Sequence, residues 1–295
     1  MAGTGFPRAG RLRFVHRAAN SIGDDWGPVP AVEAGARSAG AGPSDAEGGR
    51  TLTRSLVRFS GSEDSPLSLV CIPWAGAGAA PFRSWAGVMP ADTGLLAARF
   101  PGRESRIRER PIDDLRELVR VVSTDVGQLG GSVALFGHCS GAIVAFEVAR
   151  ALRQESNPPA RLFLASQVAP HSAGESPPRD PSSDLRDELR RRGLTSELIL
   201  ANDELLALLR PAIEADLRLI DSYTYLPAKP LAIPITAFVA RADPLVSIDR
   251  VEAWSLETTA TFALMELTAN HLFTGEAWNR LGRAVVQQRG SSTWL

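Results

Sequence analysis

Short apolar runs alternate with amphipathic stretches from residue 67 to the C-terminal part of the chain. The runs that predict buried strands are 67–72, 95–100, 133–136, 161–165, 233–239 and 262–267. Between them, apolar residues recur every three or four positions and predict helices, one of which Asp113 or Asp114 can cap. Strands that alternate with helices form a parallel sheet covered on both faces, and ligands bind beyond the carboxyl ends of such strands. The predicted fold class is therefore α/β.

The alternation stops between Pro170 and Pro230. This stretch opens with Pro, Ser and Asp residues and continues with helical patterns over 183–192, 196–200 and 204–222. A helical insertion between two core strands predicts a lid over the active-site edge, spanning about residues 171–225. The alternative is a helical bundle that only adds stability.

The first 62 residues differ in composition from the rest of the chain. They are rich in Gly, Ala, Pro, Ser and Arg, and neither a strand period nor a helix period persists through them. We therefore expect residues 1–62 to be a largely disordered extension and residues 63–295 to form the domain. A targeting peptide is the competing interpretation, because Arg8, Arg11 and Arg13 occur with no early acid. No apolar core of about 7–15 residues follows them, which disfavours a secretory signal.

Composition excludes several classes of function. With 295 residues of which 44% are hydrophobic, the chain can bury one large core. The net charge of −1 argues against nucleic acid or an anionic membrane as the main partner, and no apolar run reaches the roughly 18 residues of a membrane span. The only two cysteines, Cys71 and Cys139, provide neither a disulfide framework nor metal-ligand spacing. We expect a cytoplasmic monomer without a metal or cofactor.

The segment Gly137-His138-Cys139-Ser140-Gly141 separates an apolar run from a helical pattern. A strand, a sharp turn and a helix in this order predict a nucleophile elbow, in which the apical side chain sits above a helix N-terminus. The residues two before and two after the apex must be small, because a Cβ atom there would strike a crossing backbone. This requirement decides which residue is the nucleophile.

Cys139 at the apex places glycine at both crowded positions, so we predict a cysteine nucleophile. If Ser140 were the apex, His138 and Ala142 would occupy those positions, and an imidazole does not suit the tighter one. The non-catalytic alternative is a glycine-flanked turn around a buried structural cysteine.

A thiol nucleophile needs a general base, and His271 is the histidine best placed for that role. It lies in the loop after the last predicted strand, where the histidine of such a triad is expected. The other three histidines are His16 in the N-terminal segment, His138 inside the elbow and His171 before the lid.

Asp243 is the predicted acid that orients this histidine. It follows the strand 234–240 directly, and a carboxylate there can accept the Nδ1 proton and stabilise the imidazolium. An Asp-Pro turn without catalytic function is the alternative for Asp243. Asp249 is the second choice of acid.

The oxyanion hole is predicted to combine the backbone N–H of Ser140 with that of Ala75. Ala75 lies in the small-residue loop 73–78 after the first predicted strand, where backbone amides can approach an acyl oxygen. A phosphate cradle is disfavoured, since the spacing is not G-x-G-x-x-G and no P-loop lysine follows.

Three motifs together resemble a known family. They are Ile72-Pro73-Trp74-Ala75-Gly76, then Phe100-Pro101-Gly102-Arg103-Glu104-Ser105-Arg106, and Phe136-Gly137-His138-Cys139-Ser140-Gly141-Ala142. The chain resembles the type II thioesterases of nonribosomal peptide and polyketide assembly lines over residues 66 to about 285. The segment 209–225 looks like that family's passage from lid to core, and Asp243 and His271 fall where its acid and histidine belong.

The resemblance implies an α/β-hydrolase fold and hydrolysis of stalled or aberrant acyl groups from the phosphopantetheine arm of carrier proteins. Carrier proteins present acidic helices, so Arg103 and Arg106, together with Arg83, are candidate contacts for carrier or substrate. Their alternative interpretation is as solvated surface arginines.

The chain departs from the family at its nucleophile, because the family usually carries serine at position 139 and a methionine-like residue at position 140. A thiolate that attacks a thioester exchanges sulfur for sulfur in a nearly balanced step. The acyl-enzyme is then more activated than an oxygen ester, so transfer to an amine or hydroxyl competes with hydrolysis. Three functions stay open: a thioesterase, an acyltransferase or cyclising thioesterase with the same triad, and a non-enzymatic carrier-protein binder.

Overall fold

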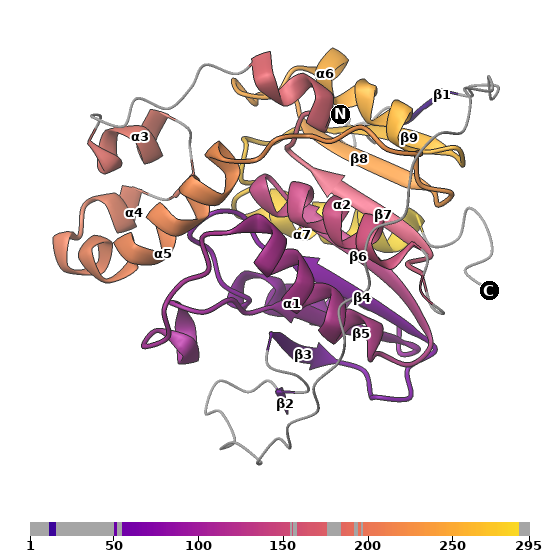
Figure 1. Cartoon of the computed structure of the whole chain (residues 1–295), viewed down its shortest axis with the longest axis horizontal. Helices are drawn as coiled ribbons and strands as arrows, with labels where there is room; N and C mark the ends of the chain where they lie inside the picture. The colour runs from indigo at the N-terminus through magenta and orange to yellow at the C-terminus, as the bar shows by residue number, and fades with distance from the viewer. Residues whose placement is uncertain are drawn as a thin grey trace, which may run out of the picture.

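The computed structural model describes residues 12–15, 50–51, 55–153, 155, 158–175, 184–191, 194–195 and 197–288 (Figure 1). A twisted sheet runs through the middle of the molecule. Helices cover its two faces, and a helical insertion lies at one end. The chain therefore has the predicted α/β architecture.

In the described part of the chain the sheet has nine strands, in the order β1-β9-β8-β7-β6-β4-β5-β3-β2. The six strands from β9 to β5 pair in parallel, and the outer strands β1, β2 and β3 pair antiparallel. Their bounds are Leu12–Val15 for β1, Arg50–Thr51 for β2, Leu56–Ser60 for β3, Leu67–Ile72 for β4, Thr93–Ala98 for β5, Ser132–His138 for β6, Arg161–Ala165 for β7, Ile235–Ala240 for β8 and Phe262–Leu267 for β9.

Each central strand is buried on both faces, which explains why apolar runs rather than alternating patterns encode them. In β4, Val70 and Ile72 contribute to the core that contains helices α1 (Leu115–Gly127) and α2 (Ser140–Leu152). Leu69 and Cys71 contribute to the opposite core, with α7 (Glu276–Gln287) and the 3-10 helix η1 (Ala80–Val88). The strands predicted at these positions are confirmed, with ends that shift by at most a few residues.

Of the two predicted caps, Asp113 and Asp114, it is Asp114 that caps α1. Its side chain accepts a hydrogen bond of 2.8 Å from the N–H of Glu117. Two shorter elements, α6 (Ile248–Glu252) and η4 (Ala253–Glu257), connect β8 to β9. Among the described residues, none of the helices combines the length and apolar composition needed to cross a lipid bilayer.

The domain begins earlier than residue 63, where the sequence predicts its start. Strand β3 lies inside the segment expected to be disordered, yet Leu56 and Val57 are buried and pair with β5. Strand β3 was not predicted from the sequence because this short strand is stabilised by pairing with β5, about forty residues further along the chain. Strands β1 and β2 also fall in that segment. Most of the remainder of residues 1–54 lies outside the described ranges, so the expected disorder stays a prediction there.

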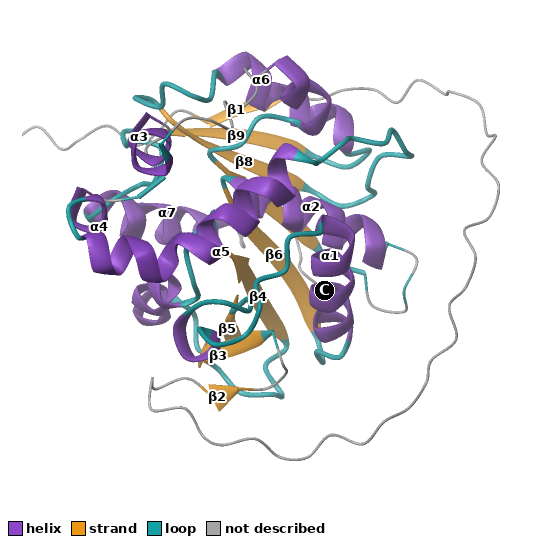
Figure 2. Cartoon of the chain, turned by 60° about the vertical axis from the view of Figure 1, so that its left-hand side comes forward, coloured by secondary structure: helices purple, strands orange, loops and turns teal. Residues whose placement is uncertain are grey.

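The predicted lid consists of α3 (Leu185–Arg191), α4 (Glu197–Leu200) and the long α5 (Asp203–Asp221), preceded by η3 (Pro170–Glu175). These helices project from one end of the sheet (Figure 2). Their buried apolar side chains form one cluster with Cys139: Leu185, Leu189, Leu194, Leu200, Leu206, Ile213 and Leu217. Leu205 and Leu208 instead face solvent, with exposed fractions of 36% and 57%. The insertion therefore covers the predicted nucleophile, which favours the lid over the purely stabilising bundle.

Candidate active site

Cys139 lies at the apex between β6 and α2, in a backbone conformation that a non-glycine residue seldom adopts. Its φ is 51° and its ψ is −123°. Strain of this kind persists only where the surrounding structure enforces it. Here the Cys139 N–H donates to the carbonyl of Ala165 at 2.8 Å, and the Cys139 carbonyl accepts from the N–H of Ala142 at 2.8 Å. The strand-turn-helix elbow predicted from the sequence is confirmed, with Cys139 at its apex and Ser140 as the first residue of α2.

Both flanking glycines are required by close backbone contacts. A Cβ atom on Gly137 would lie 2.3 Å from the carbonyl oxygen of Gly141. A Cβ atom on Gly141 would lie 2.4 Å from the carbonyl oxygens of Ile72 and Pro73. The second contact is with the segment that leaves β4, so the elbow and the predicted oxyanion loop are packed directly against each other.

His271 and Asp243 meet at the carboxyl ends of β9 and β8. The Nδ1 atom of His271 lies 2.7 Å from Oδ2 of Asp243, and both side chains are almost fully buried. The other carboxylate oxygen accepts the N–H of Leu245 at 2.9 Å. Because the carboxylate of Asp243 can only accept a hydrogen bond, Nδ1 of His271 carries the proton that is shared between them. The second candidate acid, Asp249, lies exposed in the first turn of α6 and does not make this contact.

His271 also interacts with the Cys139 side chain. Burial by itself disfavours the charged imidazolium, but the negative charge of ionised Cys139 and the hydrogen bond to Asp243 together raise the pKa of His271 above its ordinary value. Apart from the interaction with Cys139, the Nε2 atom has no hydrogen-bond partner among the described residues. The interaction with Cys139 and the hydrogen bond to Asp243 therefore favour the protonated imidazolium form of His271.

A second histidine, His138, supports the loop that carries His271. The carbonyl oxygen of His271 accepts the Ser166 hydroxyl at 2.8 Å and lies 3.0 Å from Nε2 of His138. Because a carbonyl can only accept, Nε2 of His138 carries the proton and Nδ1 holds a lone pair without a partner in the described part of the chain. Burial, reinforced by the positive charge of His271, lowers the pKa of His138 to about 3 and keeps it neutral.

This role was not assigned from the sequence to His138, which lies 133 positions from His271 in the chain. Aromatic rings enclose it, with the centroid of Trp74 at 5.1 Å and that of Trp278 at 5.7 Å. The position of His138 beside the apex of the elbow was the sequence signal for this role, because a polar ring buried there needs a hydrogen-bond partner.

The expected oxyanion donors lie on two segments that touch. Ser140 begins α2, where unpaired N–H groups and the helix dipole favour negative charge. Ala75 lies in the loop whose preceding residues, Ile72 and Pro73, abut Gly141. The next two amides of that loop already donate within the protein, Gly76 to Asp216 and Ala77 to the carbonyl of Trp74. Ser140 and Ala75 stay our prediction for the hole.

Arg103 and Arg106 are buried, with exposed fractions of 2% and 9%. Arg103 forms a two-pronged ion pair with Asp216 of the lid, at 2.8 and 2.9 Å. Arg106 binds Glu109 and donates to the carbonyl of Arg99 at 2.9 Å. Their guanidinium groups are used inside the protein, which disfavours the expected contact with a carrier or substrate, and that contact stays a prediction. The alternative interpretation as solvated surface arginines does not fit their burial.

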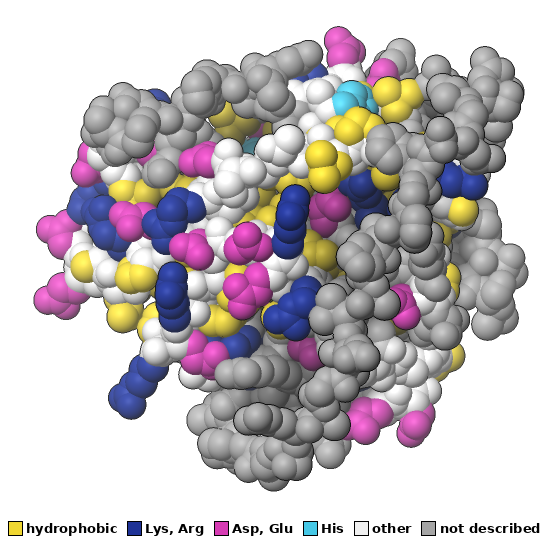
Figure 3. All heavy atoms as spheres, in the orientation of Figure 1, with side chains coloured by type: hydrophobic (Ala, Val, Ile, Leu, Met, Phe, Trp, Pro, Cys, Tyr) yellow, Lys and Arg dark blue, Asp and Glu magenta, His cyan; other side chains and the backbone are white. Residues whose placement is uncertain are grey.

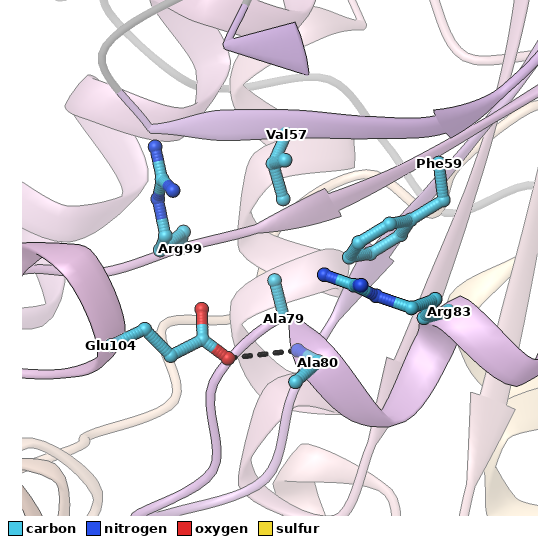
Figure 4. A pocket seen from close by; sticks show the side chains of 7 residues that line it. All are labelled: Val57, Phe59, Ala79, Ala80, Arg83, Arg99 and Glu104. Carbon is cyan, nitrogen blue, oxygen red and sulfur yellow. Dashed lines mark hydrogen bonds between the residues drawn. The ribbon is translucent and has the colours of Figure 1, made fainter. Parts of the chain in front are cut away.

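A shallow hollow lies elsewhere, beside β3 and η1 (Figure 4). It is lined by Val57, Phe59, Ala79, Ala80, Arg83, Arg99 and Glu104. The Arg83 guanidinium stacks 5.5 Å from the Phe59 ring centroid, and Glu104 accepts the N–H of Ala80 at 2.8 Å. None of the candidate catalytic residues lines this hollow. Within the described ranges no three His, Cys, Asp or Glu side chains form a group that could hold a metal ion.

The chain is similar to known proteins in both sequence and structure. Residues 68–287 match the family model described as "Thioesterase domain". The chain is 34% identical over 226 residues to the gramicidin S biosynthesis protein GrsT of Aneurinibacillus migulanus, covering 75% of this chain and 88% of GrsT. Among solved structures, the RedJ thioesterase from the prodiginine biosynthetic pathway of Streptomyces coelicolor is similar with a TM-score of 0.71 and 32% identity, covering 78% of this chain and 93% of RedJ. The type II thioesterase BorB from the borrelidin biosynthetic cluster is similar with a TM-score of 0.69 and 27% identity. The match covers 79% of this chain and 96% of BorB.

The elbow contacts lead to a stability prediction. Gly141→Ala should destabilise the fold by about 1–3 kcal/mol, because its new Cβ atom must push two backbone carbonyls apart. Gly87→Ala is the matched control, since a Cβ atom there meets nothing within 4 Å. Urea unfolding of the two variants and the wild type measures the difference. Equal stability of both variants would contradict the proposed crowding.

The support of His271 by His138 leads to a second prediction. His138→Leu should slow iodoacetamide alkylation of Cys139 by about tenfold or more, because the loop of His271 loses a donor and the imidazole is displaced from the thiol. His138→Gln should stay near the wild-type rate, since its amide can donate from a similar position. Intact mass spectrometry follows the reaction, and Cys71 is fully buried, so one label per folded chain is expected. Identical rates for Leu and Gln would argue against this role.

Proposed function

Because the chain belongs to the thioesterase family, and within it to the type II thioesterases of nonribosomal peptide and polyketide pathways, we propose that Cys139, His271 and Asp243 form its catalytic triad. The enzyme is a thioester hydrolase. The observation that best supports these residue roles is the hydrogen bond of 2.7 Å between His271 and Asp243, on a histidine that interacts with the apical Cys139.

The proposed reaction has two displacements at one acyl carbon. The Cys139 thiolate attacks the thioester carbonyl carbon, a new C–S bond forms, and the substrate C–S bond breaks as the leaving thiolate takes a proton from the His271 imidazolium. Neutral His271 then removes a proton from water as the water oxygen attacks the acyl-enzyme. Cleavage of the acyl-cysteine bond releases the acid and restores the thiolate-imidazolium pair. Asp243 holds the imidazole tautomer throughout.

The backbone N–H groups of Ser140 and Ala75 are the proposed oxyanion hole. Negative charge develops on the carbonyl oxygen in both displacements, so donors fixed beforehand stabilise both transition states more than the substrate. The position of Ser140 at the N-terminus of α2 supports its part in the hole.

Acyl transfer is the second candidate function, and the lid is the observation that favours it. Cys139 is only 9% exposed, and the lid's apolar side chains pack in the same cluster. Water reaches an acyl-cysteine under such a lid less readily than at an open surface, and a thioester reacts well with amines. An acceptor amine or hydroxyl that enters beneath the lid would then compete with water.

The substrate we propose is an acyl group on the phosphopantetheine arm of a carrier protein. A long arm suits a nucleophile that lies beneath a lid, and the relatives named above come from assembly-line pathways. The docking surface has to be sought away from Arg103 and Arg106. On the face seen in Figure 3, acidic and basic side chains are interspersed. Ion pairs within the lid include Arg190 with Glu197 and Arg210 with Glu214. The monomeric state and the cytoplasmic location stay predictions.

The raised pKa of His271 gives the triad a pH-dependent signature. A raised pKa means that the imidazolium persists through neutral pH and is lost only as pH rises, so it stabilises the Cys139 thiolate on the acidic side. At about pH 6, His271→Ala should be alkylated by iodoacetamide at least tenfold more slowly than the wild type, and the difference should shrink toward about pH 9, where free thiols ionise unaided. A rate difference that does not change with pH would contradict the ion pair.

The triad also predicts how combined substitutions behave. Cys139→Ala should abolish hydrolysis and Cys139→Ser should keep part of it, because His271 can serve as base for either atom. His271→Ala and Asp243→Ala should each lower kcat by orders of magnitude, and the double variant little more than the worse single one. Ser140→Ala is the control and should stay active, since Ser140 acts through its backbone. Full activity in Cys139→Ala with none in Ser140→Ala would reverse the assignment.

The carrier-protein substrate predicts a preference that depends on the arm and the carrier. An acetyl carrier protein should be hydrolysed with a higher kcat/KM than acetyl-N-acetylcysteamine, because remote contacts contribute binding energy. The acyl group is the same in both, so the comparison isolates the carrier. Product analysis with an added amine tests the transfer reaction in the same assay. Equal efficiency on the two thioesters would favour a general small-molecule hydrolase.

A further inference from the structure

A buried ion pair joins the lid to the loop expected to form the oxyanion hole. Asp216 lies on α5 of the lid and Arg103 lies in the segment after β5, 113 positions earlier in the chain. Arg103 donates from both Nη atoms to the two carboxylate oxygens, and their side chains are 3% and 10% exposed. Further hydrogen bonds help to offset the cost of burying such a pair, so its other partners matter.

Those other partners lie in the loop after β4. The Gly76 N–H donates to Oδ2 of Asp216 at 2.7 Å, and Arg103 also donates to the carbonyl of Ala77 at 2.9 Å. Gly76 has a φ of +78°, and a Cβ atom there would lie 2.7 Å from Cγ1 of Ile213. Ile213 and Asp216 are three residues apart and so lie on one face of α5. One face of the lid helix thus holds this loop by a close contact and a charged hydrogen bond.

The loop itself is a turn that aims the Ala75 amide. The Ala77 N–H donates to the Trp74 carbonyl at 3.0 Å, and the positive φ of Gly76 is that required at the third position of a type II turn. In a trans peptide the carbonyl and the following N–H point in opposite directions. Because the Trp74 carbonyl points into the turn, the Ala75 N–H points out of it. The orientation of that donor is therefore set by the same turn that Asp216 and Arg103 hold.

We propose that Asp216, held in place by Arg103, is a positioning residue that fixes the Ala75 N–H in the oxyanion hole. Since Asp216 belongs to α5, the hole is complete only while the lid lies closed over Cys139. The same helix supplies Leu206, Ile213 and Leu217 to the cluster around the thiol. Closure thus covers the nucleophile and orders the oxyanion donor in one movement. This inference rests on the proposed function of the triad, and it assigns the regulation of that reaction to the lid.

The test separates positioning from general lid packing. Asp216→Asn removes the charge and Arg103→Lys removes the two-pronged geometry. Each substitution should lower kcat for hydrolysis of the thioester on an acylated carrier protein by about 10- to 100-fold. KM should change by less than about threefold, because an oxyanion donor acts mainly in the transition state. Iodoacetamide alkylation of Cys139, which forms no oxyanion, should stay within about twofold of the wild-type rate. Arg106→Lys is the matched control, because Arg106 is buried in the same segment but pairs with Glu109.

Two outcomes would overturn the inference. Unchanged kcat in both variants would show that the turn is held without Asp216. Parallel changes in kcat, KM and alkylation rate would show that the pair only packs the lid. Thermal unfolding identifies a variant that is not folded at the assay temperature, and the other variant then decides.

An aldehyde probe distinguishes failure of this inference from failure of the proposed function. Acetaldehyde adds to the Cys139 thiolate: a C–S bond forms, the carbonyl electron pair moves to oxygen, and His271 stays an imidazolium beside the resulting oxygen anion. The oxygen occupies the oxyanion hole, so aldehyde affinity should fall about tenfold or more in Asp216→Asn. If the wild type hydrolyses no thioester and the affinity still falls, the proposed function fails and the positioning role stands. If hydrolysis proceeds and neither kcat nor affinity responds, only the positioning role fails.

Discussion

The close packing of three backbone segments around Cys139 is the constraint on which the rest of the site depends. Gly137 allows β6 to turn back against the start of α2, and Gly141 allows α2 to lie against the carbonyls of Ile72 and Pro73. Any side chain at either position would separate these segments. Their contact forces Cys139 into its strained conformation, with φ at 51°, and brings the loop with Ala75 next to the N-terminus of α2. The proposed nucleophile and the Ser140 amide are thus positioned by steric exclusion before any substrate binds.

Two buried charged pairs complete the site, and they have different physical tasks. Asp243 and His271 follow the adjacent parallel strands β8 and β9, and their hydrogen bond sets the tautomer of the histidine proposed as base. Asp216 and Arg103 come from the lid and from a segment of the core, and they hold the loop that carries Ala75. Each carboxylate accepts at least one backbone N–H as well, from Leu245 in the first pair and Gly76 in the second. These backbone hydrogen bonds help to compensate the buried charges, so each pair also fixes a loop.

The proposed cysteine nucleophile fits this environment for a chemical reason. A thiolate at this position would be stabilised by an imidazolium whose pKa is raised, whereas an alcohol would need to lose its proton during the attack. Apolar side chains of the lid lie in one buried cluster with Cys139, which limits the access of water to the thiol. His138 stays neutral beside this pair and adds a hydrogen bond without adding a competing charge.

The sequence by itself determined the features that depend on local sterics and periodicity. Apolar runs encoded the doubly buried strands, and two glycines encoded the register of the elbow. The positions of Asp243 and His271 after successive strands placed them at one edge, because parallel strands end together. The tertiary structure decided what depends on partners distant in the chain. Strand β3 forms because β5 is beside it, Arg103 is buried because Asp216 arrives from the lid, and His138 finds the carbonyl of His271 across the sheet edge. A charged or polar side chain has the same local pattern whether it faces water or a buried partner, so only the folded arrangement distinguishes the two.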